Sequence, residues 1–482
     1  MSACGGMAQV TQAPINSAEL TGPDGALEER GAAGLVGRLM STLIRTLAWS
    51  KLSEPKVAIT VSGAGLLLSM FVGATAPNAE TLAIRLPLST FLPSLSHTII
   101  IVTAMLYTGV ILAGLGLAGM LWAHSQGWQP NPRHLLMAST VVAAVMVSLT
   151  PVGSSDTGSY AAYGRIAAQG GNPYTTNPET WGDHAYTYVV GAIWKQQPSV
   201  YGPIATAVQR FAATIGGANV AITIWILMIL NGAVFIGVGW LLLKTSDDPV
   251  RATLFWTANP VLIQQLVGGG HLDTFVAAAA ICAIQLARRT SSIRGDVLIA
   301  ILVGLACGVK IYAVLIGAGL AWPLLRSHEW KRVVVITVVS VATLALEYSF
   351  YGLGALKPLF GGLKQVTLPS PSWSVEKIGL ALHASHTTTA TIISCLWPIA
   401  LIVVAWFIQR CISSDQPQEV VWPFVLTFAW VLVAPWVFAW YTAVAWAALT
   451  QVPRNRMTRW LAIVTVLLAL CLSSGGRAAL GQ

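Results

Sequence analysis

Residues 98–122 read TIIIVTAMLYTGVILAGLGLAGMLW and contain no charged side chain. A helix of this length crosses the hydrocarbon core of a bilayer, which needs about 20 apolar residues. The whole chain of 482 residues is 55% hydrophobic and 9% charged, whereas soluble domains have about 25% charged residues. Since helices satisfy their own backbone hydrogen bonds in lipid, we predict an all-α polytopic membrane protein.

Similar apolar runs recur along the chain and predict a bundle of about 13 transmembrane helices. The runs between residues 252 and 326 are interrupted by glycine, proline or single charges, so we expect some of those helices to be tilted or broken. The predicted spans are 57–76, 98–122, 134–153, 218–243, 252–268, 273–288, 296–308, 311–326, 333–351, 388–409, 420–436, 438–451 and 460–475.

The basic residues fall in alternate segments between these runs. Loops rich in lysine and arginine stay on the cytoplasmic side of a membrane, and basic residues before the first run place the N-terminus inside. Alternation from there gathers the tight basic clusters on one side. They are Arg133; Lys244 and Arg251; Arg288, Arg289 and Arg294; Arg326, Lys331 and Arg332; Arg410; and Arg454, Arg456 and Arg459.

The organisation that follows has three parts. Residues 1–34 are polar and rich in glycine and alanine, which predicts a disordered cytoplasmic N-terminus. Residues 35–56 predict a basic amphipathic helix on the inner leaflet, and 57–476 form the transmembrane domain. The net charge of +9 is explained by the inner loops and does not indicate nucleic-acid binding. No glycine-rich phosphate loop appears, which argues against an ATP-driven pump.

The outer segments carry the unusual side chains. They are 154–217, 267–273, 307–310, 352–387 and 434–441, which are poor in clustered charge but contain Asp, His, Trp, Tyr and single Lys residues. Lone ionisable groups at membrane depth are costly and mark functional sites by default. We therefore expect the functional face to be the outer, extracytoplasmic one.

Asp156 opens the stretch DTGSYAAYGRIAAQGG at the start of the 154–217 loop. A poorly solvated carboxylate there has a raised pKa unless a partner offsets the shift, which suits a general base. Its place before a helical pattern equally fits an N-cap, and both interpretations stand. Tyr160 and Tyr163 lie on the apolar face of that pattern, which predicts a helix flat on the membrane. Residues 199–217 predict a second interfacial helix, with Pro203 in its first turn.

His271, Asp273 and Lys310 are the other ionisable candidates on this face. Three glycines precede His271, which allows close approach of the backbone, and Asp273 lies where it can orient the imidazole. Lys310 stands between two apolar halves and suits a phosphate, although snorkelling to the interface explains it equally well. Tyr and Trp rings suit sugar faces, although a single one is ordinarily a membrane-belt residue. The aromatic candidates are Tyr160, Tyr163, Tyr201, Trp373, Trp440 and Tyr441.

Five pieces of the chain, in order, resemble one family. They are SDTGSYAAYGRIAAQGGNPY, VYGPIATAVQRF, FWTANPVLIQQLVGGGHLDTF, GVKIYAVL and PWVFAWYTAVAW. Together they resemble the GT-C superfamily, and most closely its actinobacterial polyprenol-phosphate-mannose-dependent α-1,6-mannosyltransferases of the MptA/MptB type. The resemblance covers about residues 55 to 475.

The resemblance implies a GT-C-like fold and transfer of mannose from a polyprenyl-phosphate donor to a glycolipid or lipomannan acceptor on the outer face. It implies a single inverting displacement with Asp156 as base, while Lys310, His271 or Arg210 stabilises the leaving phosphate. It implies no metal or other cofactor. Many GT-C enzymes carry the acidic residue directly after the first span, where this chain has Glu80, so Glu80 is the alternative base.

Other functions remain open on the sequence. Another lipid-phosphate-sugar transferase, such as an arabinofuranosyltransferase or a protein O-mannosyltransferase, fits the same residues. A flippase or transporter of lipid-linked sugars would show polar residues lining several spans and matching halves. No convincing internal repeat is visible, which disfavours a transporter.

Overall fold

The computed structural model describes residues 49–52, 54–75, 84–95, 98–358, 366–368, 370–413 and 415–472. The chain divides into two units, Met1–Ser53 and Glu54–Gln482. In the first unit only the short helix α2 (Trp49–Leu52) is described. The predicted disordered segment 1–34, most of the predicted helix over 35–56, and Glu80 all lie outside the described residues.

The second unit is helical, and its described residues contain no strand. Its first helices are α3 (Pro55–Thr75), α4 (Pro87–Thr90), α5 (Ile99–Ser125), α6 (Pro132–Met146), α7 (Asp156–Ala168), α8 (Pro178–Trp181), α9 (His184–Tyr188), η1 (Ala192–Trp194), α10 (Pro203–Gly216) and α11 (Val220–Thr245). Next come α12 (Pro249–Phe255), α13 (Pro260–Leu262), the π-helix η2 (Ile263–Gly268), α14 (Asp273–Arg289), α15 (Ile293–Val309), η3 (Ile311–Ala313), α16 (Val314–Arg326) and α17 (Trp330–Ser349). The remainder are η4 (Leu353–Leu356), α19 (Pro371–Ala381), α20 (His386–Arg410), α21 (Gln418–Val433), η5 (Ala439–Tyr441), α22 (Thr442–Leu449) and α23 (Met457–Leu472).

Local chemistry sets several of the helix starts. The Asn131 side chain accepts from the backbone N–H of Arg133 at the start of α6, and the Asn219 side chain accepts from two N–H groups of α11. A side-chain oxygen at this position satisfies N–H groups that have no partner inside the helix. Proline in the first turn of α6, α10 and α12 costs no hydrogen bond, because those N–H groups are free anyway.

Five helices among the described residues are long and apolar enough to cross a membrane, which supports the prediction of a membrane protein. They are α3, α5, α11, α17 and α20. The other predicted spans contain shorter or interrupted helices, so the number of crossings remains a prediction. The run 252–268 is broken, as expected: α12 ends at Phe255 and α13 begins at Pro260.

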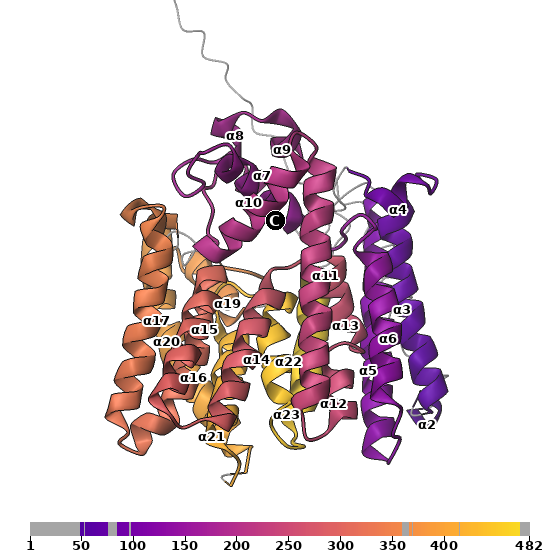
Figure 1. The fold of residues 1–482 in the computed structure, drawn as a ribbon. Helices are drawn as coiled ribbons and strands as arrows, with labels where there is room; N and C mark the ends of the chain where they lie inside the picture. Colours follow the sequence, from indigo (N-terminus) through magenta and orange to yellow (C-terminus); the bar gives the residue numbers. More distant parts are fainter. Residues whose placement is uncertain are drawn as a thin grey trace, which may run out of the picture. The chain divides into compact units, whose positions relative to one another are not determined.

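The helices of Glu54–Gln482 place two kinds of loop at opposite ends. The segment from α7 to α10 lies at the upper end in Figure 1, above α14 and α22. The turns that join α5 to α6, α14 to α15, α16 to α17 and α22 to α23 lie at the lower end. These lower turns are the predicted basic ones, so Asp156 and the arginine-rich turns are at opposite ends.

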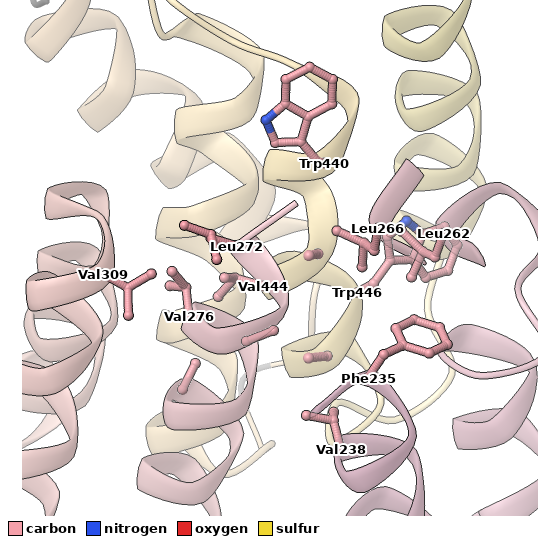
Figure 2. Packing of buried hydrophobic residues seen from close by; sticks show 14 of the residues in the cluster. Phe235, Val238, Leu262, Leu266, Leu272, Val276, Val309, Trp440, Val444 and Trp446 are labelled. Carbon is pink, nitrogen blue, oxygen red and sulfur yellow. The ribbon is translucent and has the colours of Figure 1, made fainter. Parts of the chain in front are cut away.

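The core of this unit lies where α11, η2, α14 and α22 meet (Figure 2). The Trp256 ring stacks on Phe235 at 5.1 Å between centroids, and its Nε1 donates to the Phe235 carbonyl. Trp446 is fully buried and its Nε1 donates to the Thr465 hydroxyl. Buried aromatic rings each remove about 150–250 Å² from solvent or lipid, and these two indole N–H groups are both paired.

Candidate active site

Asp156 is the first residue of α7. Its backbone N–H donates to the Ser154 hydroxyl at 3.1 Å, and no side chain caps the helix. The carboxylate is therefore not an N-cap, and that alternative is wrong. Its Oδ2 accepts from the Tyr160 hydroxyl at 3.4 Å, one turn further along the same helix. The side chain is 19% exposed, so it is accessible to a reactant from outside the core.

Helix α7 packs closely against α10. A Cβ on Gly164 would lie 2.3 Å from the Gln209 carbonyl oxygen, so only glycine permits this approach. Both predicted helices of this loop are thus present, but the prediction that the face of α7 bearing Tyr160 and Tyr163 lies on the membrane is wrong. Both rings are 0% exposed. They pack inside the protein against Tyr201, which precedes α10, at 4.9 and 6.3 Å between ring centroids.

His271 is brought to Asp156 by a tight glycine turn. Gly270 has φ +68°, and a Cβ there would lie 2.5 Å from the Thr157 side chain. Both the positive φ and the lack of space for a side chain favour glycine at this position. The turn after η2 therefore approaches the start of α7 closely, as the glycine run predicted. His271 Nδ1 then lies 3.4 Å from Asp156 Oδ2, and the imidazole is 1% exposed.

Three flat rings form a stack beside this pair. The His271 ring lies on Trp440 at 3.6 Å and 11°, and Trp440 lies on Phe438 at 4.6 Å and 4°. The rings come from the turn before α14 and from the segment leading into α22. His271 Nδ1 is buried and has no well-aligned hydrogen bond among the described residues, and the stacked Trp440 ring contacts the face of the imidazole and restricts its orientation.

Asp273 and Lys310 form a buried ion pair next to the stack. Their Oδ2 and Nζ atoms are 2.6 Å apart, and the side chains are 0% and 8% exposed. The Tyr312 hydroxyl donates to the other carboxylate oxygen at 2.8 Å. The Lys310 ammonium also lies over the Tyr441 ring at 4.7 Å and the Tyr201 ring at 5.6 Å. Lysine has three N–H donors, so Asp273 does not exhaust its capacity.

The protonation states follow from these contacts. Burial raises the pKa of the Asp156 carboxyl, but contact with His271 and the nearby Lys310 and Tyr160 groups outweigh burial and leave that pKa below its ordinary value. Burial lowers the pKa of the His271 imidazole. At neutral pH the site therefore holds an ionised carboxylate beside a neutral imidazole. The raised Asp156 pKa that burial alone predicts does not occur, because a partner offsets it.

Nine of the predicted residues come together in this region. They are Asp156, Tyr160, Tyr163, Tyr201, His271, Asp273, Lys310, Trp440 and Tyr441. Arg210 lies on the exposed side of α10, and its charge interacts electrostatically with Tyr351 instead. Trp373 lies on α19 beneath the Lys377 ammonium. The structure thus places these two predicted residues outside the Asp156 cluster.

Two residues of the cluster were missed from sequence. Tyr312 follows Lys310 by two positions and holds Asp273, and Phe438 precedes Trp440 by two positions and backs the ring stack. Each of these two residues lies two positions from a predicted site residue, and this spacing was the sequence signal that could have identified it. Within the described ranges, no three His, Cys, Asp or Glu side chains lie together as a metal ion would need.

Comparisons with known proteins show which family this chain resembles. A family model described as "Alpha-(1->6)-mannopyranosyltransferase, N-terminal domain" matches residues 59–326. A Mycobacterium tuberculosis protein named alpha-(1->6)-mannopyranosyltransferase A is 26% identical over 388 residues, which are 74% of this chain and 73% of that protein. A Mycolicibacterium smegmatis relative, a probable alpha-(1->6)-mannopyranosyltransferase, is 26% identical over 65% of this chain and 52% of its own length. A Corynebacterium glutamicum alpha-(1->6)-mannopyranosyltransferase A is 24% identical over 43% of this chain and 50% of its own. No solved structure matches.

Proposed function

This chain belongs to the alpha-(1->6)-mannopyranosyltransferase family of the MptA/MptB type, and from that premise we propose that it transfers mannose from a polyprenyl-phosphate donor to a hydroxyl of a glycolipid or lipomannan acceptor. The reaction takes place at the end of the bundle that holds Asp156. The names of the relatives support mannose over arabinose as the transferred sugar.

The observation that carries the proposal is the environment of Asp156. Its carboxylate is partly exposed at 19%, contacts Tyr160 and His271, and has a pKa that keeps it ionised. An ionised carboxylate accepts a hydrogen bond from an incoming hydroxyl. That hydroxyl becomes far more acidic as its oxygen bonds to carbon, so a base of low pKa still removes the proton late in the step.

The proposed step is one inverting displacement. The acceptor oxygen forms a bond to the anomeric carbon of mannose, and the bond from that carbon to the phosphate oxygen breaks. The hydroxyl proton passes to an Asp156 oxygen, and the polyprenyl phosphate leaves with the bonding electrons. Attack opposite the leaving group inverts the anomeric centre, so the β-linked donor that the family resemblance implies yields an α-linkage.

Lys310 is the proposed partner of the leaving phosphate. Its ammonium is already positioned by Asp273 at 2.6 Å and by the Tyr441 ring, and a fixed cation stabilises developing negative charge without reorganising. Neutral His271 supplies a hydrogen-bond donor rather than a second charge. The Tyr201 ring offers an apolar face to the sugar. Trp440, whose ring is stacked between His271 and Phe438, orients the imidazole instead.

The distribution of charge supports an extracytoplasmic site on a multi-pass membrane protein. The arginine-rich turns gather at the end of the helices opposite α7–α10 (Figure 1). By the positive-inside rule that end is cytoplasmic. The exposed residues Phe211 and Ile215 on α10 supply apolar contact for the bilayer surface, where a polyprenyl chain is anchored.

The test compares Asp156→Asn with Asp183→Asn in purified full-length protein. Asp183 belongs to the same loop but pairs with Arg165 at 2.9 Å, away from the candidate site. With polyprenyl-phosphate-mannose and a mannan acceptor, Asp156→Asn should bind donor normally and transfer at least about 100-fold more slowly, while Asp183→Asn stays near wild type. Polyprenyl-phosphate-arabinose in parallel tests the sugar, and product linkage is read by mass spectrometry after methylation.

Full transfer by Asp156→Asn would remove Asp156 as the base. A Glu80→Gln variant that alone loses transfer would assign that role to Glu80 instead. Donor binding without a glycosylated product in every variant and wild type would favour a flippase over a transferase.

A further inference from the structure

A cavity lies at the opposite end of the helices from Asp156. It has a volume of about 170 Å³, several times the ~30 Å³ that one water molecule occupies in the liquid. It lies where α5 ends, α12 begins and the α22–α23 turn passes. Its walls include Leu121, His124, Arg251, Phe255, Arg454 and Thr458. None of these residues belongs to the proposed transfer site.

Arg251 is the buried cation of this cavity. The residue is 5% exposed, its Nη1 donates to the Val452 carbonyl at 2.8 Å, and its guanidinium lies 4.3 Å over the Phe255 ring. Its Nη2 is buried and has no hydrogen-bond partner among the described residues. A charged N–H group left without a hydrogen bond inside a protein is destabilising, so an anionic acceptor that reaches this nitrogen would be stabilising.

The charge around the cavity is net positive. Asp248 Oδ2 is 3.0 Å from His124 Nε2 and 3.4 Å from an Arg454 nitrogen. This region thus holds one carboxylate, Asp248, and two guanidinium groups, Arg251 and Arg454, which leaves one positive charge over. His124 Nδ1 lies 3.0 Å from the Trp128 carbonyl, and only an N–H can pair with a carbonyl. A neutral ring therefore accepts from Arg454 through Nε2, whereas a protonated ring donates from Nε2 to Asp248 and adds a second net positive charge.

The start of α23 also faces this cavity. The Asn455 side chain accepts from the Met457 backbone N–H at 2.9 Å, which fixes the first turn, and Thr458 in that turn lines the cavity. The N-terminus of a helix carries a partial positive charge and free N–H groups that favour anions. The helix end and the unpaired Arg251 nitrogen are independent features that favour the same ligand charge.

We propose that this cavity binds a phosphate group, carried either by an anionic lipid headgroup or by free inorganic phosphate. Arginine pairs with phosphate through parallel N–H bonds, and Arg251 and Arg454 approach from different elements. Leu121 and Phe255 form an apolar wall beside them, which suits the glycerol and first methylenes of a lipid. The basic turns at the same end attract anionic headgroups toward the cavity.

The experiment uses the full chain and measures two ligands separately. Native mass spectrometry of the protein released from nanodiscs counts retained phosphatidylglycerol against phosphatidylcholine. Thermal unfolding in a neutral detergent compares inorganic phosphate with chloride at equal ionic strength. The variants are Arg251→Gln and Arg454→Gln. Arg326→Gln is the matched control, because Arg326 is an exposed arginine in the last turn of α16 and does not line the cavity.

We expect wild type and Arg326→Gln to retain phosphatidylglycerol or to be stabilised by phosphate, with affinity reduced at least about tenfold in Arg251→Gln and Arg454→Gln. Retained phosphatidylglycerol identifies the lipid headgroup as the source, and stabilisation by inorganic phosphate alone identifies the free ion. Arg454 is 57% exposed, so its variant should fold even if Arg251→Gln does not. Neither ligand binding wild type, or equal loss in Arg326→Gln, would overturn the proposal.

Discussion

Replacing Asp273 by asparagine tests how the buried ion pair is held. The Asp273→Asn amide keeps an oxygen for the Tyr312 hydroxyl, which donates to Asp273 Oδ1 at 2.8 Å in the wild type. The change therefore removes little except the negative charge opposite Lys310, whose Nζ is 2.6 Å from Asp273 Oδ2. Lys310→Met is the reciprocal change, since it keeps the length of the side chain and removes the ammonium.

The expected magnitude follows from burial. The Asp273 side chain is 0% exposed and the Lys310 side chain is 8% exposed. Removing one member of such a pair leaves an uncompensated buried charge, which lowers the free energy of unfolding by about 3–5 kcal/mol. Each single variant should lose that much free energy of unfolding. The double variant leaves no buried charge and should lie within about 1.5 kcal/mol of wild type. Glu329→Gln is the control, because Glu329 pairs with Arg332 at 3.0 Å but is 46% exposed; exposed pairs contribute about 0–1 kcal/mol.

The assay is reversible unfolding in mixed micelles, followed by the fluorescence of the 19 tryptophans. Transfer activity is measured alongside, and the double variant should stay inactive although it regains stability, because the proposed phosphate partner is gone. Single variants as stable as Glu329→Gln would refute the reasoning, as would a double variant less stable than either single one.

Three further predictions concern the same region. Gly164→Ala should destabilise the packing of α7 on α10 by about 1–3 kcal/mol, because the new methyl group meets the Gln209 carbonyl at 2.3 Å; hydrogen exchange should show faster opening of both helices, and unchanged protection would contradict this. Trp440→Leu removes the ring stacked on His271 at 3.6 Å and should lower kcat more than it raises KM in the transfer assay, whereas a pure KM effect would limit Trp440 to sugar binding. The pKa of Asp156 is lowered from 3.8, so the carboxylate is charged at any pH above that value. Its contribution to folding stability is present there and is lost only as the pH falls through the lower, folded-state pKa. Transfer activity should therefore hold down to about pH 5. An acid limb near the ordinary histidine value would instead implicate His271.

Much of the candidate site was predictable because its residues are costly in their sequence context. Asp156, His271, Asp273 and Lys310 each stand out from apolar surroundings, and the glycine run before His271 indicated the close approach seen at Gly270. The sequence alone does not say which charges pair. Lys310 pairs with Asp273, which is 37 positions away in the sequence. Packing of α14 against α15 brings the two side chains together.

Burial of α7 shows the limit of helical periodicity. The spacing of Tyr160 and Tyr163 indicates one apolar face on the helix. Such a face can be buried equally well against lipid or against other helices, so the pattern does not distinguish the two. The structure resolves the choice in favour of protein, because Gly164 lets α10 approach closely enough to cover both rings. Arg210 shows the same limit for charge, since its place on the outer side of α10 follows from that packing.

Apolar length and the order of motifs are local properties of the chain, and they are enough to identify a helical membrane protein of the mannosyltransferase family. Asp156 contacts an imidazole stacked on Trp440 and keeps its charge as a result of packing, because a pKa depends on neighbours that are distant in the chain. The cavity around Arg251 likewise exists only once three separate helix ends have been packed together.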